Sequence, residues 1–178
     1  MMETPWQGPQ ASLADQQSQL SVPLMAALSC TGSLTRQLEK AWQRPVNVRL
    51  EQQKRQSGPE ESTLFDGYAL EQSGPVLIRD AWLTVDGTDR IFAHSQILLS
   101  DLPQSIQDPL EAGEIPLGAL FLQRNERVRR QQLELARARI PALAERLDVS
   151  DRTVFWCRRS LFQVETGVRA RILEVFLP

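Results

Sequence analysis

Two charged residues interrupt apolar stretches of the chain, and they are the first candidates for chemistry. Arg79 lies within residues 76–83, and Glu174 lies within residues 172–177, at the end of the chain. The planar guanidinium of an arginine matches a carboxylate, and a lone buried carboxylate would have a raised pKa, as many catalytic acids and bases have. Arg79 could instead pair with Asp80 or reach water from a strand edge, and Glu174 could face solvent. By pattern alone, the structural role is the more common outcome for each.

Arg158 and Arg159 are a second pair of candidates, adjacent on a predicted strand. Successive side chains of a strand point to opposite faces, so at most one of them can line a pocket on the covered face. Trp156 shares a face with Arg158 and would form an aromatic wall beside a cation, although a Trp that fills the core is at least as common. Arginines at such places suit carboxylates, but this pattern does not identify a ligand.

The sequence gives little support for a metal site, a nucleotide-binding site or a Ser-His-Asp catalytic triad. His94 is the single histidine, and Cys30 and Cys157 lie far apart without metal-ligand spacing. A disulfide between the two cysteines is formally possible, but we expect free thiols that pack as small apolar residues. No Gly-rich phosphate loop is present. We therefore expect no metal and no cofactor.

Composition indicates one soluble domain. The 178 residues are 42% hydrophobic, enough for a core, and the net charge of −2 provides no field that would attract nucleic acid. No apolar run is long enough to span a membrane, and the first residues do not resemble a signal peptide. We therefore expect a cytoplasmic protein, and a monomer.

The elements that must position these residues can be read from periodicity and turn signals. Residues 1–20 are polar and predict a mobile tail, so the domain should cover 21–178. Helical spacing over 23–42, interrupted at 31–33, predicts two short helices, the second capped by Ser33 or Thr31 and ending before Pro45. Alternation predicts a strand at 46–51 and two hairpins, at 76–100 around Asp86-Gly87 and at 153–177 around 165–167. Residues 101–115 predict a loop with about one helical turn, and 141–147 a short helix. The pattern indicates an α+β fold on an antiparallel sheet.

Four blocks of residues occur in an order that resembles the chorismate pyruvate-lyase family. They are R-x-x-x-L-x-x-D-G at 79–87, P-L-G at 116–118 followed by Leu120 and Phe121, W-x-R-R-S at 156–160, and E-x-F-L-P at 174–178. The segment S-L-T-R at 33–36 matches more loosely. No single block is specific, but four in the same order are.

The resemblance implies an antiparallel sheet whose helices and flap loops cover a buried ligand site. It also implies a cofactor-free enzyme that splits chorismate into 4-hydroxybenzoate and pyruvate, the first committed step of ubiquinone biosynthesis. In that family an arginine and two backbone N–H groups hold the ring carboxylate, and a glutamate meets the para oxygen. By motif position these are Arg79, the N–H groups of Leu34 and Leu117, and Glu174. Leu34 stands where the family's best-known member has methionine, a change that a backbone contact should tolerate. We hypothesise that Glu174 is a general acid and that Arg158 binds the second carboxylate of chorismate.

Residues 122–153 form a longer stretch than the family pattern predicts, and it is rich in arginine: Arg124, Arg127, Arg129, Arg130, Arg137 and Arg139. Two glutamates, Glu126 and Glu134, dilute the positive charge, and no base-stacking aromatic residues are interleaved. We therefore expect a solvated face rather than a nucleic-acid interface.

Two other functions remain open at this stage. The same fold serves as the effector-sensing domain of some bacterial transcription regulators, although residues 1–45 are too short and too polar at the start for the helix-turn-helix that precedes such a sensor. The other alternative is a chorismate lyase that forms a different hydroxybenzoate isomer.

Overall fold

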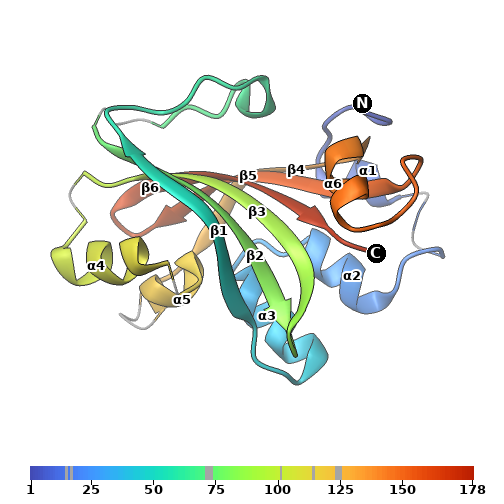
Figure 1. The fold of residues 1–178 in the computed structure, drawn as a ribbon, viewed down its shortest axis with the longest axis horizontal. Helices are drawn as coiled ribbons and strands as arrows, with labels where there is room; N and C mark the ends of the chain where they lie inside the picture. The colour runs from blue at the N-terminus through green and yellow to red at the C-terminus, as the bar shows by residue number, and fades with distance from the viewer. Residues whose placement is uncertain (15, 17, 71–73, 101, 114, 123–125) are drawn as a thin grey trace.

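The backbone of this computed structural model is built on one antiparallel sheet of six strands, in the order β1-β2-β3-β6-β5-β4 (Figure 1). The residues described are 1–14, 16, 18–70, 74–100, 102–113, 115–122 and 126–178. The strands are β1 (Asn47–Gln56), β2 (Val76–Val85), β3 (Thr88–Leu98), β4 (Arg129–Arg139), β5 (Val154–Val164) and β6 (Gly167–Phe176). The predicted α+β fold on an antiparallel sheet is confirmed.

Both predicted hairpins are present. β2 turns into β3 at Asp86 and Gly87, whose φ angles of 49° and 77° match the left-handed two-residue turn that suits the twist of paired strands. β5 turns into β6 just before Gly167. Because β3 also pairs with β6, Ala93 lies opposite Glu174 on one side and Arg158 lies opposite Glu174 on the other. The last strand of the chain therefore lies at the centre of the sheet.

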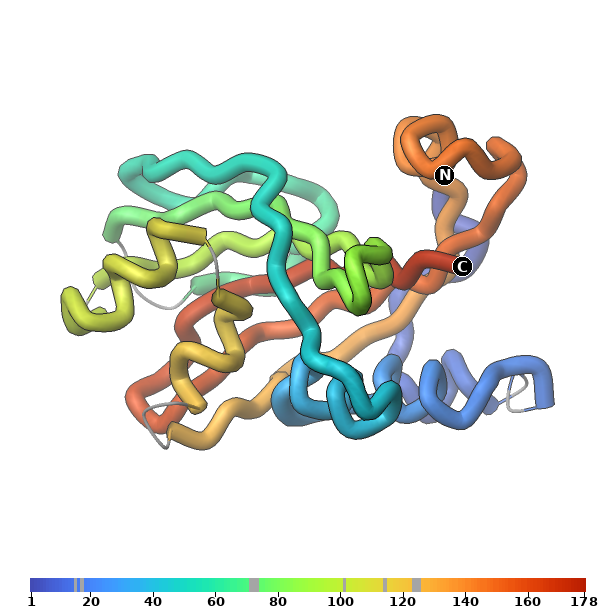
Figure 2. Tube along the Cα trace, turned by 60° about the horizontal axis from the view of Figure 1, so that its bottom comes forward, coloured from blue at the N-terminus to red at the C-terminus, as the bar shows by residue number. Residues whose placement is uncertain are grey.

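Four helices cover one face of the sheet (Figures 1 and 2). They are α2 (Val22–Leu28), α3 (Leu34–Trp42), α4 (Gln104–Ala112) and α5 (Leu117–Leu122). As predicted, Ser33 caps α3, because its Oγ accepts a hydrogen bond from the N–H of Arg36 at 3.4 Å. Two apolar clusters join these helices to the sheet, one under α4 and α5 and one under α2 and α3. Between these two apolar clusters, polar side chains of the sheet can lie buried under the helices.

The helix α4 differs from the sequence expectation, which was a loop with about one helical turn. Pro109 lies inside this helix, where it removes one backbone donor. Ile106 and Leu110, spaced four residues apart, are both completely buried against the sheet. Burial of two such side chains stabilises by about 1.5–3 kcal/mol each, which outweighs the unfavourable proline. The helix ends at Ala112, and the next residue, Gly113, caps it with a left-handed φ of 79°.

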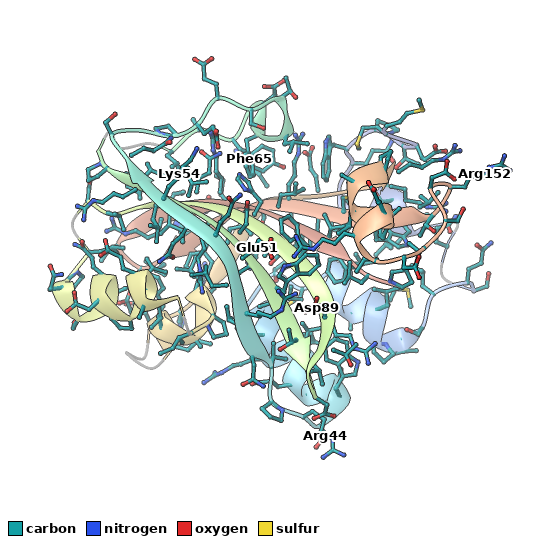
Figure 3. All side chains as sticks on the ribbon, viewed as in Figure 1. Arg44, Glu51, Lys54, Phe65, Asp89 and Arg152 are labelled. Atoms are coloured by element: carbon teal, nitrogen blue, oxygen red, sulfur yellow. The ribbon has the colours of Figure 1, made fainter. Side chains whose placement is uncertain are left out.

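The opposite face of the sheet is covered more lightly, by η1 (Thr63–Phe65), α6 (Pro141–Arg146) and the N-terminal segment. Phe65 lies on this side, away from α4 and α5 (Figure 3). Its apolar cluster includes Trp82, Phe155 and Leu173.

The N-terminal segment is not a free tail in the structure, in contrast to the sequence expectation. Met2 and Gln7 form bridges to Ala138 and Leu135 of β4, and the short helix α1 (Pro9–Leu13) follows, with Leu13 buried. β4 is an edge strand, so its outer N–H and C=O groups are open to pairing. Backbone pairing does not require apolar side chains, which is why composition gave no sign of it. Residues 15 and 17 lie outside the described residues.

Candidate functional site

A small cavity lies between the sheet and the helices α3 and α5, and it brings together four of the residues singled out in the sequence. Arg79, Leu34, Leu117 and Glu174 all line it. They come from β2, α3, α5 and β6, which are separated by up to 140 positions along the chain. The cavity volume is about 60 Å³, room for a few water molecules. The fifth sequence candidate, Arg158, is not among the lining residues.

Arg79 reaches the cavity from the middle of β2 and is 3% exposed. Its Nη2 donates hydrogen bonds to the carbonyl oxygens of Gly113 and Ile115, at 2.8 and 3.3 Å. Asp80 does not pair with it, because Asp80 points to the other face and contacts His94 at 2.6 Å. Among the described residues Arg79 has no ion pair, and its Nε has no hydrogen-bond partner. Burial lowers the pKa of Arg79, so an anionic ligand here would compensate a buried cation.

Leu34 and Leu117 each occupy the first position of a helix, α3 and α5 respectively. The first N–H groups of a helix have no acceptor inside it, so they are available to a ligand. The two helix starts come close together. A Cβ on Gly118 would lie 3.2 Å from the Ser33 Oγ, so glycine permits this approach of α5 to α3. The side chains of Leu34 and Leu117 are buried, which leaves their backbones as the polar part of this wall.

Glu174 is 2% exposed and is held by two arginines, one at each carboxylate oxygen. Arg158 Nε donates to Oε2 at 2.7 Å, and Arg130 Nη2 donates to Oε1 at 2.9 Å. Burial alone would raise the pKa of Glu174, but the two guanidinium groups outweigh it and hold that pKa below its usual value. The sequence expectation of a raised pKa is therefore wrong, since it assumed a lone carboxylate. Glu174 is ionised at neutral pH.

Arg158 lies behind Glu174 and is completely buried. Besides its bond to Glu174, its Nη1 donates to the carbonyl oxygens of Ala27 and Cys30, at 2.6 and 3.2 Å. These carbonyls are at the C-terminal end of α2, where a cation is favourable. Arg158 therefore connects α2 to Glu174, and the geometry gives no support to its predicted role at a second carboxylate. Arg159 points to the other face and pairs with Glu134 at 2.7 Å, as the strand alternation predicts.

Arg130 is the residue of the cavity that sequence reasoning missed. It was expected on a solvated, arginine-rich face, but its side chain is 7% exposed and lines the cavity beside Glu174. Simple alternation along β4 does not predict which face Arg130 points to, because the strand has an irregularity between Gln131 and Glu134, where Gln132 has a φ of 49°. Arg130 and Leu135 thus share a face although they are five residues apart. Of the other arginines in this stretch, Arg124 lies outside the described residues.

A larger hollow, of about 880 Å³, lies on the opposite face between η1 and α6. Its wall is mainly apolar, and its polar part includes the His94 and Asp80 pair. Arg79, Arg130 and Glu174 do not line it, so the smaller cavity, which holds the buried charges, is the candidate site. Cys30 and Cys157 are free, as expected, and burial raises the pKa of Cys157 to about 12.

The described part of the chain has neither a cluster of metal-binding side chains nor a membrane-spanning helix. No group of three or more His, Cys, Asp or Glu side chains there is arranged to hold a metal ion. No helix there has both the length and the apolar character needed to cross a membrane.

The fold is that of an antiparallel α+β protein, and its small cavity is lined by the buried side chains of two arginines and one glutamate. The chain belongs to the chorismate lyase family, because the family model described as "Chorismate lyase" matches residues 6–178. A "Probable chorismate pyruvate-lyase" of Psychromonas ingrahamii is 32% identical over 150 residues, 82% of this chain and 77% of that protein. One of Thiobacillus denitrificans is 36% identical over 115 residues, 61% of this chain. That match spans 59% of the Thiobacillus protein, less than two thirds of its length.

Solved structures share the fold at low sequence identity. PhnF from Mycobacterium smegmatis superposes with a TM-score of 0.62 at 17% identity, covering 83% of this chain and 64% of PhnF. The separate effector domain of PhnF gives a TM-score of 0.60 at 18% identity, covering 82% of this chain and 88% of the domain. At such identities the likeness concerns the fold alone.

Proposed function

We propose that this protein is a chorismate pyruvate-lyase that converts chorismate into 4-hydroxybenzoate and pyruvate. The observation that carries the proposal is the convergence of Arg79, Leu34, Leu117 and Glu174 at one enclosed cavity. Membership of the chorismate lyase family supports the same activity. The convergence matters because nothing in the order of the sequence blocks requires these residues to meet.

The reaction needs positioning more than activation. Chorismate loses its enolpyruvyl group and one ring proton, and the ring that remains is an aromatic phenol. The formation of the aromatic ring therefore supplies the thermodynamic driving force of the reaction. The ether bond breaks, the three-carbon fragment leaves as enolpyruvate, takes up a proton and becomes pyruvate. Arg79 and the N–H groups of Leu34 and Leu117 fix the ring carboxylate, and this contact orients the ring for the elimination.

Glu174 acts at the opposite end of the ring, at the para oxygen. Its lowered pKa argues against a donor of protons in the ligand-free protein, because two arginines keep it ionised. As a carboxylate it accepts a hydrogen bond from the para hydroxyl and orients that group. A Glu174→Gln variant tests whether a proton moves through this residue: if it keeps full kcat, Glu174 only orients the ligand.

The activity is tested by incubating the purified protein with chorismate and following pyruvate with lactate dehydrogenase, while chromatography identifies the aromatic product. We expect equal amounts of pyruvate and 4-hydroxybenzoate. An Arg79→Met variant should lose the activity, and Arg55→Met, at an exposed ion pair of β1, is the matched control that should keep it. Pyruvate with another hydroxybenzoate would point to the isomer-forming lyase. Tight binding of 4-hydroxybenzoate without any pyruvate would point to a sensor instead.

Four finer points belong to the same proposal. We infer that the 4-hydroxybenzoate supplies ubiquinone biosynthesis, that the protein works in the cytoplasm, and that it acts as a monomer without a cofactor. The two free thiols suit a reducing compartment. Sedimentation at several protein concentrations tests the oligomeric state.

A further inference from the structure

Arg130 lines the cavity beside Glu174, which Arg158 does not. Its Nη1 donates to Ser160 Oγ at 3.2 Å and its Nη2 to Glu174 Oε1 at 2.9 Å, while its guanidinium lies over the ring of Phe162, 5.4 Å from the centroid. The backbone N–H of Arg130 also bonds to Thr31, in the turn before α3. These contacts fix the side chain. Its Nε is buried and has no partner among the described residues.

The charges around the cavity do not balance. Among the described residues, three guanidinium groups, those of Arg79, Arg130 and Arg158, stand against one carboxylate, that of Glu174. Within this described set two positive charges are left over, on side chains that are buried. Burial lowers the pKa of both Arg79 and Arg130, which is the expected response of buried cations that lack a full set of partners. A ligand with two negative charges would compensate this excess, and one with a single charge would not.

The two cavity-facing cations also stand in the correct order for such a ligand. When Arg79 holds the ring carboxylate, the para oxygen lies across the ring at Glu174. In chorismate the enolpyruvyl ether is on the carbon next to the one that bears the para hydroxyl, so its carboxylate must lie beside Glu174. Arg130 is bonded to Glu174 and lines the cavity, whereas Arg158 does not line it.

We propose that Arg130 binds the second carboxylate of a dicarboxylate ligand and so distinguishes substrate from product, which has lost that group. This assignment rests on the proposed function and deepens it. Arg130 contacts the departing fragment, and Arg158 holds Glu174 in place behind it. A matched pair of ligands isolates the second carboxylate. 3-(Carboxymethoxy)-4-hydroxybenzoate carries a carboxylate on an ether beside the para hydroxyl, and 4-hydroxy-3-methoxybenzoate carries the same ether without it.

The experiment measures the dissociation constants of both ligands by calorimetry for the wild type, Arg130→Gln and Arg130→Lys. We expect the wild type to prefer the dicarboxylate at least tenfold, Arg130→Gln to lose that preference, and Arg130→Lys to keep part of it through its charge. Arg137→Gln is the control: Arg137 is on the same strand but lies over Trp156, so the preference should stay. In the lyase assay, Arg130→Gln should raise the KM for chorismate while inhibition by 4-hydroxybenzoate changes little.

The outcomes separate this inference from the proposed function. If Arg130→Gln keeps the full preference for the dicarboxylate, Arg130 is not the second-carboxylate residue, although the lyase activity can stand. If Arg130→Gln fails to fold, the wild type and Arg130→Lys still decide, and a wild type without any preference for the dicarboxylate overturns the inference. A wild type that binds neither ligand would count against the proposed function itself.

Discussion

Replacing Arg158 by Met should destabilise the protein strongly, because this arginine is a buried structural link. The change removes the bond to Glu174 at 2.7 Å and leaves the carbonyl oxygens of Ala27 and Cys30 without this donor. Removing one partner of a buried ion pair costs about 3–5 kcal/mol. For a chain of this length, about 1 kcal/mol lowers the melting temperature by about 2–4 °C, so the expected loss is roughly 6–20 °C.

Urea denaturation measures this effect as a lower midpoint at an unchanged slope. The control is Arg55→Met, which removes an ion pair to Glu111 of similar length, 3.2 Å, but with side chains 55% and 40% exposed. Exposed pairs contribute about 0–1 kcal/mol, so the control should remain close to the wild type. If Arg158→Met loses less than about 1 kcal/mol, the charge of Arg158 does not support Glu174 and the reasoning from the buried network is refuted.

Three further predictions concern acid stability, the approach of two helices and a turn. The pKa of Glu174 is lowered in the folded protein, so its contribution to stability is present above the unfolded pKa of about 4.3 and disappears as the pH falls through the folded pKa. The free energies of unfolding of the wild type and Glu174→Gln should therefore differ at pH 7 and converge in acid. A difference that stays constant with pH would contradict the lowered pKa. Gly118→Ala should weaken 4-hydroxybenzoate binding several-fold in calorimetry, since its Cβ would press on Ser33 Oγ at 3.2 Å, and adding Ser33→Ala should recover part of the affinity. Gly87→Ala should cost about 1–2 kcal/mol in urea unfolding because φ is 77° there, whereas Gly58→Ala, with open space around it, should be neutral.

Much of the fold followed from local signals. Alternating apolar residues and turn chemistry predicted both hairpins, and Ser33 predicted the start of α3, because each of these depends on residues close together in sequence. The helix α4 was missed because two prolines and a glycine suggest a loop, while its stability comes from Ile106 and Leu110 packing on distant strands. The pairing of the N-terminal segment with β4 was missed for a similar reason, since an edge strand accepts backbone partners of any composition.

The sequence by itself identified the family and three of the residues that line the cavity, Arg79, Leu117 and Glu174, because they stand inside blocks whose order can be recognised without coordinates. Only the tertiary structure decided what surrounds Glu174. A buried carboxylate alone would be raised in pKa, and one between two arginines is lowered. The second of those arginines, Arg130, reaches the cavity because a bulge in β4 shifts its side chain to the covered face. Strand alternation cannot reveal such a shift, since one extra residue reverses which face every later side chain meets.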